Sequence, residues 1–176
     1  MSTPDTPTRQ LTHVSLVARD VEVSAAFYEE VVGCEPIPTP RFGTQEDFHT
    51  DDDDIEFQML RAGDQQLHLW NDPGRPVESV QFAHFGIHVD DFERVYREAK
   101  ARDAFAAIGE STAPPQVFEF NGNAQIYLRD PTGNLFEVDH PDIDALDRST
   151  FDEVVSRQTS GPDVGVYTEA VEQNLG

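Results

Sequence analysis

Lysine and cysteine are almost absent from this chain of 176 residues, which has one of each, Lys100 and Cys34. Lysine and arginine together number 12 against 34 aspartates and glutamates, so the formal net charge is −22. Phosphate binding draws its affinity from lysine and arginine, so we expect neither nucleic acid nor an anionic membrane as a partner. A single cysteine cannot form a disulfide within the chain, which fits a reducing compartment.

Long apolar runs are missing as well. No stretch approaches the roughly 20 apolar residues that span a bilayer, and the polar residues 1–5 do not resemble a signal peptide. We therefore expect a cytoplasmic protein. An excess of acids with almost no lysine also predicts a halophilic, haloarchaeal-type source, because molar salt shortens the Debye length to about 3 Å and screens a negative surface.

The chain contains one internal repeat. Residues 11–21 and 82–92 each begin as an apolar strand with a histidine near its start, and each then reaches an aspartate. His13 and His84 are 71 residues apart, as are Asp20 and Asp91. A helical pattern follows each aspartate, over 21–32 with an end at Gly33 and over 92–99, with Asp20 and Asp90 or Asp91 as N-caps.

Strand patterns follow each predicted helix, and they lie at 55–61, 66–70, 125–129 and 134–139. Each half is interpreted as a βαβββ module, and the two modules, 9–75 and 80–147, form one α+β domain with a curved mixed sheet around a cleft. A linker at 72–76 separates the modules. We expect loops at 39–54 and 114–123, disorder at 1–8, and a weakly structured tail at 148–176 with a short helix over 151–155.

Four potential metal ligands occupy equivalent positions in the repeat. His68 follows His13 by 55 residues, and Glu137 follows His84 by 53. A single histidine on a strand is more often structural, but strand alternation turns all four donors away from their apolar neighbours, onto the face that we expect to be concave. Three imidazoles and a carboxylate suit Zn, Ni, Mn, Co or Fe(II) rather than Mg or Ca. We therefore predict one divalent metal in the cleft.

A metal with open positions can bind two neighbouring oxygens of a substrate, and Glu137 is the candidate catalytic base. Arg129 is the candidate partner of a substrate carboxylate, and His88 shares the face of His84. The remaining side chains predicted to line the substrate pocket are aromatic: Trp70, Tyr127, Phe118 and Phe120.

Four phrases of the sequence resemble the vicinal oxygen chelate superfamily, which includes glyoxalase I, extradiol dioxygenases and bleomycin-binding proteins. They are LTHVSLVARD (11–20), Phe27–Tyr28, AHFGIHVDD (83–91) and DPTGNLFE (130–137). The resemblance implies paired βαβββ modules around one divalent metal, with ligands on the strands that carry the four donors. It also implies a homodimer that acts on a small molecule.

Three functions stay open. The first is a glyoxalase-type lyase or isomerase, although relatives of glyoxalase I usually carry glutamate at the position of His68, which leaves Glu137 as the carboxylate base. The second is an Fe(II) ring-cleaving dioxygenase, whose two histidines and one glutamate would match His13, His84 and Glu137. The third is a small-molecule resistance or sequestration protein. The modules pair either within one chain or between two chains.

Overall fold

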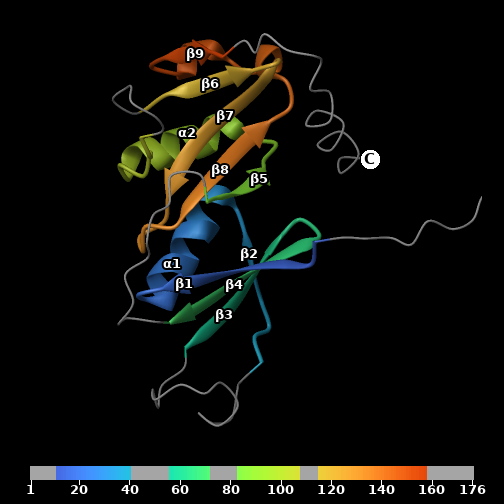
Figure 1. Ribbon diagram of the computed structural model, residues 1–176, viewed down its shortest axis with the longest axis vertical. Coiled ribbons are helices and arrows are strands. Elements are labelled where there is room, and N and C mark those ends of the chain that lie inside the picture. The colour runs from blue at the N-terminus through green and yellow to red at the C-terminus, as the bar shows by residue number, and fades with distance from the viewer. Residues whose placement is uncertain (1–10, 41–55, 72–82, 108–114, 158–176) are drawn as a thin grey trace, which may run out of the picture.

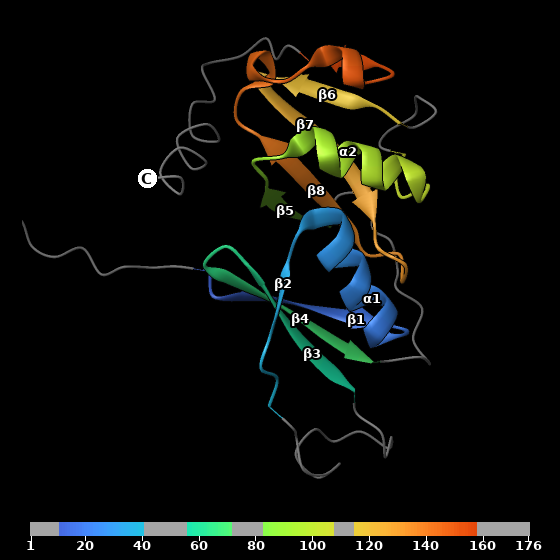
Figure 2. The ribbon, with the colours of Figure 1, turned by 180° about the vertical axis from the view of Figure 1, so that it is seen from behind.

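The computed structural model describes residues 11–40, 56–71, 83–107 and 115–157. Within these ranges nine strands form two sheets, and each sheet carries one helix on one face (Figure 1). The sheets follow one another along the long axis of the molecule, with both helices on the same side (Figure 2). The predicted α+β fold class is confirmed. None of the helices in the described ranges is long and apolar enough to cross a bilayer.

The first sheet has the strand order β1-β4-β3-β2. Strand β1 (His13–Ala18) is parallel to β4 (Gln65–Asn71), which is antiparallel to β3 (Phe57–Ala62), and β2 (Glu35–Ile37) lies at the far edge. Helix α1 (Val21–Phe27) buries its apolar residues against this sheet. Strand β1 is therefore an edge strand.

The second sheet has the order β5-β8-β7-β6-β9 and repeats this arrangement. Its helix is α2 (Phe92–Ala101). Its strands are β5 (Phe85–His88), β6 (Val117–Phe120), β7 (Asn123–Arg129), β8 (Leu135–His140) and β9 (Val154–Ser156). Here too the first strand, β5, is parallel to the last strand of the module, β8, and lies at the edge.

Both helices begin as the sequence predicts. The side chains of Asp20 and Asp91 each accept a hydrogen bond from the backbone N–H three residues later. The first helical stretch changes to a π-helical turn, Tyr28–Val32, and ends at Gly33 with a φ of 88°, a conformation that glycine adopts without a Cβ clash.

Two local expectations are wrong. The expected loop at 114–123 contains β6 and a two-residue hairpin turn, Asn121–Gly122, with both φ values positive. An Asn-Gly pair favours this kind of turn. The expected helix at 151–155 is absent; the β-branched pair in β9 adds a strand to β6 instead. The expectations for residues 1–8, 41–54, 72–76 and 158–176 lie outside the described residues.

The turn between β7 and β8 joins the two modules. Asp130 is buried, and its carboxylate accepts hydrogen bonds from the backbone N–H groups of the next residues, Thr132 to Asn134, and from the Tyr28 hydroxyl (3.2 Å) of the first module. Asn134 Nδ2 donates to the carbonyl of Val17 in β1 (2.9 Å). The Asp-Pro-Thr-Gly-Asn phrase therefore holds the second sheet to the first.

A surface contact fixes the end of α2. Lys100 Nζ donates to Asp152 Oδ1 (2.6 Å), and the backbone N–H of Asp152 donates to the Tyr96 hydroxyl (3.0 Å). The segment that leads into β9 is thereby attached to the helix.

Candidate metal centre

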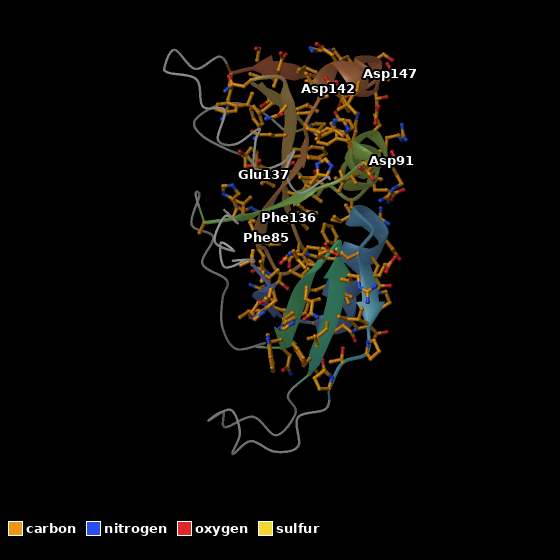
Figure 3. All side chains as sticks on the ribbon, turned by 90° about the vertical axis from the view of Figure 1, so that its right-hand side faces the viewer. Phe85, Asp91, Phe136, Glu137, Asp142 and Asp147 are labelled. Carbon is orange, nitrogen blue, oxygen red and sulfur yellow. The ribbon has the colours of Figure 1, made fainter. Side chains whose placement is uncertain are left out.

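In each sheet the two candidate donors lie at neighbouring parallel strands with the same offset, His84 being the residue just before β5. In the first sheet, Ser15 of β1 pairs with His68 of β4, and His13 lies two residues before Ser15. In the second sheet, Gly86 of β5 pairs with Glu137 of β8, and His84 lies two residues before Gly86. Residues two apart on a strand share a face, so each pair shares one face of its sheet. Figure 3 shows Glu137 on the side of β8 away from Asp91, where α2 begins.

The pair in the second sheet is compact, and its carboxylate is buried. His84 Nε2 lies 3.3 Å from Glu137 Oε2, and the Glu137 side chain is only 5% exposed. Two donors that share one zinc ion at about 2.1 Å are separated by about 3.0–3.4 Å in octahedral or tetrahedral geometry. The His84–Glu137 distance therefore lies within the range of two donors on one ion, which is also the range of an ordinary ion pair.

The pair in the first sheet is arranged differently. The His13 and His68 rings stack with centroids 4.4 Å apart and an interplanar angle of 10°. His68 Nε2 hydrogen-bonds Gln66 Oε1 (2.9 Å), and His13 Nδ1 hydrogen-bonds Thr12 Oγ1 (3.0 Å), so one nitrogen of each ring is engaged with a neighbouring side chain. A metal bonds in the plane of an imidazole, so one of these parallel rings must rotate before both can bind the same ion.

The four donors form two pairs within one chain. Across the described ranges, no three side chains of histidine, cysteine, aspartate or glutamate come together in a way that could hold a metal ion. The site of four ligands thus stays a prediction, and its two halves lie on separate sheets. Burial, followed by the nearby His13, lowers the pKa of His68, which favours the neutral imidazole that metals require.

Trp70 lies beside the first pair. It stacks on Phe57 with ring centroids 3.9 Å apart, and the edge of Phe57 meets His68 at 5.4 Å. Phe57 was not among the predicted pocket residues. Phe57 lies two residues before Met59, which pairs with His68 across the strands. Residues two apart on a strand share a face, so this spacing could have identified Phe57 as a neighbour of His68.

Tyr127 and Phe118 lie beside the second pair. Tyr127 pairs directly with Glu137 across β7 and β8, and its ring meets His84 edge-on at 5.5 Å. Phe118 packs against Tyr127 at 5.8 Å and carries the Arg157 guanidinium 4.0 Å above its ring. Phe120 lies two residues further along β6, on the face of Phe118. Arg157 was not among the predicted residues.

The other two predicted pocket residues are engaged with protein groups. Arg129 Nη1 donates to the carbonyl of Gly133 (2.9 Å) in the turn that joins the modules. His88 lies between two carboxylates, with Nδ1 3.4 Å from Asp139 Oδ1 and Nε2 3.6 Å from Asp90 Oδ1.

A row of buried polar side chains continues the face of Glu137, and sequence analysis missed it. Asp139, Gln125 and Asn123 are 6%, 8% and 2% exposed. Asp139 pairs with Gln125 in β7 and with His88 in β5. Burial, with the Glu137 charge second, raises the pKa of Asp139, while His88 opposes the change. The alternation Glu137-Val-Asp139 is the sequence signal for this row.

A separate groove of about 850 Å³ lies between α1, β2 and β3. It contains none of the predicted site residues, and its acidic lining residues are Glu22, Glu29, Glu30 and Glu56. The groove shares Phe57 with the surroundings of the first donor pair, but none of the four donors lines it.

Comparisons with known proteins agree with this architecture. A family model described as Glyoxalase/Bleomycin resistance protein/Dioxygenase superfamily matches residues 10–138, which is most of the chain. The protein belongs to this superfamily. A comparison with curated proteins gives no significant match.

Three similar solved structures illustrate the fold. A glyoxalase family protein from Enterococcus faecalis is 20% identical, with 75% of this chain and 98% of that chain covered and a TM-score of 0.51. A glyoxylase/bleomycin resistance protein/dioxygenase domain from Frankia sp. EAN1pec is 18% identical (75% and 91% covered, TM-score 0.54). The fosfomycin resistance protein FosX from Listeria monocytogenes, complexed with Mn(II) and sulfate, is 14% identical (78% and 96% covered, TM-score 0.54). At these identities the likeness shows the fold alone.

Proposed function

We propose that this protein is a divalent-metal-dependent enzyme, a lyase or isomerase of the glyoxalase type, whose small substrate chelates the metal through two adjacent oxygens. The observation that carries this proposal is the equal offset of the two donor pairs, His13 with His68 and His84 with Glu137. The family membership and the Mn(II) complex of a protein with this fold support a divalent metal.

We further propose that the site forms between two copies of the chain, with the first pair from one copy and the second pair from the other. Neither pair is covered by its module's own helix, and β1 and β5 are both edge strands. Edge strands present unpaired backbone groups that favour contact with another chain. A twofold homodimer of this kind contains two equal sites.

A bound divalent metal would polarise a substrate carbonyl and acidify the neighbouring C–H group. Glu137 is the base that accepts this proton, because it is the one carboxylate among the four donors and lies in a buried position. On the other sheet, Trp70 and Phe57 offer an aromatic surface for the apolar part of the substrate.

Complementation between chains tests the shared site. One double variant, His13→Ala with His68→Ala, lacks the first pair; the other, His84→Ala with Glu137→Ala, lacks the second. Each alone is expected to bind no Co²⁺ tightly. After the two are unfolded and refolded together, half of the dimers are mixed and each has one intact site, so about one quarter of the wild-type Co²⁺ content returns. Mixing that restores no Co²⁺ binding would contradict a site shared between chains.

One observation favours a second candidate, an Fe(II) ring-cleaving dioxygenase. The hydrogen bond from His68 to Gln66 can hold this ring away from a metal, which leaves His13, His84 and Glu137 as the two-histidine, one-carboxylate set of non-haem iron enzymes. Metal analysis of anaerobically purified protein separates the two. The dioxygenase would be favoured by iron that is lost on oxidation and by a His68→Ala variant that binds the metal as tightly as the wild type. Bound Zn, Ni, Mn or Co would favour the isomerase.

A further inference from the structure

Phe118 of β6 lies on the same face of the second sheet as Glu137. Phe118 pairs with Gln125 across β6 and β7, and Gln125 pairs with Asp139 across β7 and β8. Asp139 lies two residues after Glu137 on β8, and residues two apart on a strand share a face. The face that carries the donors of the second sheet therefore extends across β7 to β6.

Arg157 extends this face to the edge of the sheet. Phe118 pairs with Val155 of β9, and Arg157 lies two residues further along, on the same face. The Arg157 backbone N–H donates to the carbonyl of Glu119 (2.7 Å), which fixes the main chain beside β6. The exposed guanidinium lies 4.0 Å from the centre of the Phe118 ring, a cation–π contact. Arg157 thus presents a positive charge on the donor face.

Arg157 has no carboxylate within ion-pair distance in the ranges that the structure describes. Several other cations of these ranges are paired with carboxylates: Arg61, Arg94, Lys100, Arg102 and Arg148. The chain has 34 acids against 12 bases, so carboxylates are plentiful. An exposed guanidinium that pairs with none of the described ones is available to an anion from outside the chain.

An aromatic path connects Arg157 with the second donor pair. The Tyr127 ring contacts Phe118 at 5.8 Å and His84 at 5.5 Å. Only β7 separates β6 from β8, so these two strands lie about 10 Å apart at the usual strand spacing. A small molecule that chelates a metal with one end can therefore extend along these rings and reach Arg157 with its other end.

We propose that Arg157 binds a carboxylate of the substrate, at the end opposite to the two oxygens that chelate the metal. This inference rests on the proposed function and specifies the substrate class: a chelating end, an apolar middle along Tyr127 and an anionic end. A guanidinium binds a carboxylate through two parallel hydrogen bonds. The net charge of −22 disfavours a doubly charged phosphate more than a singly charged carboxylate. Arg129, the residue predicted for this role, donates instead to the Gly133 carbonyl.

The test uses the full-length protein loaded with Co²⁺ and two hydroxamate probes, which chelate a metal through two adjacent oxygens. Suberic acid monohydroxamate ends in a carboxylate, and octanohydroxamate has a methyl group in its place. Shifts of the visible Co²⁺ absorption bands give the two dissociation constants, and their ratio is the measured quantity. We expect Arg157→Gln to lower the preference for the carboxylate probe by about 10-fold, the effect of a hydrogen bond between charged groups. The affinity for octanohydroxamate is expected to stay that of the wild type, which shows that the variant is folded.

Arg97→Gln is the matched control, because it removes the same charge from an exposed position on α2. We expect it to leave the ratio unchanged. An equal change in both variants would reveal only a general effect of charge, and an unchanged ratio in Arg157→Gln would show that Arg157 does not bind the carboxylate; either result overturns the proposal. Wild-type protein that holds Co²⁺ but binds neither probe overturns it too, while the metal site stands. Wild-type protein that holds no Co²⁺ contradicts the proposed function itself, and this inference falls with it.

Discussion

The two sheets place their candidate donors with the same strand register but hold them in different environments. In the first sheet, two imidazoles stack on each other; His13 is exposed and His68 is half-buried. In the second sheet, an imidazole faces a buried carboxylate, and Tyr127 lies opposite this carboxylate on the neighbouring strand. The two imidazoles of the first pair repel each other when both are protonated. In the second pair, a protonated imidazole and an ionised carboxylate attract each other.

This difference shows what the repeat determines and what it leaves open. The repeat sets the backbone positions of the donors, since both offsets follow from the same β-α-β-β-β order. The neighbouring side chains decide how ready each pair is to bind. The His84–Glu137 pair already has the spacing of two donors on one ion, whereas His13 and His68 must reorient. The second sheet is therefore the preorganised half of the proposed site.

The largest expected effect comes from removing one donor from each sheet. If both pairs bind the same metal, His13→Ala and Glu137→Ala each lower Co²⁺ affinity by at least about 100-fold, more than residues that merely support a ligand. Equilibrium dialysis gives the affinities. His140→Ala is the control, because this histidine follows Glu137 on β8 but bonds to the backbone of Asp142. A loss confined to one of the two donor variants would mean that a single sheet holds the metal.

A smaller effect concerns the buried polar row of the second sheet. The raised pKa of Asp139 means that the folded state binds the carboxyl proton more tightly than the unfolded state. Protonation of Asp139 therefore stabilises the fold at low pH, and this stabilisation is lost as the pH rises through the folded pKa. Asp139→Asn removes the cost of a buried charge, and we expect a gain on the order of 1 kcal/mol at pH 7.

Urea unfolding of the metal-free protein at pH 7 and pH 4 measures the effect of Asp139→Asn. The gain is expected to shrink toward pH 4, because the raised pKa makes the wild-type carboxyl group take up its proton earlier on acidification. Asp64→Asn, at an exposed position in the β3–β4 turn, serves as the control and is expected to change little. An Asp139→Asn gain that is the same at both pH values would show that charge burial is not its cause.

The smallest expected effect concerns the pKa of His68 in the first donor pair. Burial is the main cause of the lowered pKa of His68, and His13 adds to it. In metal-free His13→Asn, the pKa of His68 is therefore expected to rise part of the way toward that of an ordinary histidine. NMR titration of the imidazole protons follows this, with His140→Asn as the reference. An unchanged pKa would mean that the stacked rings do not interact electrostatically.

Much of the fold could be predicted from the sequence because the repeat is local and regular. The strands around His13, His68, His84 and Glu137 follow from apolar alternation, and the helix starts follow from Asp20 and Asp91. The errors lie where the local signal competes with tertiary pairing. The segment at 151–155 has a helix-compatible pattern, yet its end forms the strand Val154–Ser156 on the open edge of β6.

The candidate site could be predicted only in part. Strand patterns place each donor on a face, but they contain no information on how one module lies relative to the other, so the separation into two pairs could not be foreseen. That arrangement depends on contacts between distant residues, such as Asp130 with Tyr28 and Asn134 with Val17. Arg129 was predicted from its charge, and its bond to Gly133 arises from the turn geometry.

The isolated position of Lys100 has a practical consequence for work on this protein. It is the only lysine side chain of the chain, and it lies near the end of α2, where it contacts Asp152. The thiol of Cys34 offers no competing position, because burial raises its pKa to about 12. An amine-directed fluorophore therefore reports from one defined side-chain position, and energy transfer between donor- and acceptor-labelled chains can test the proposed homodimer without any engineered residue.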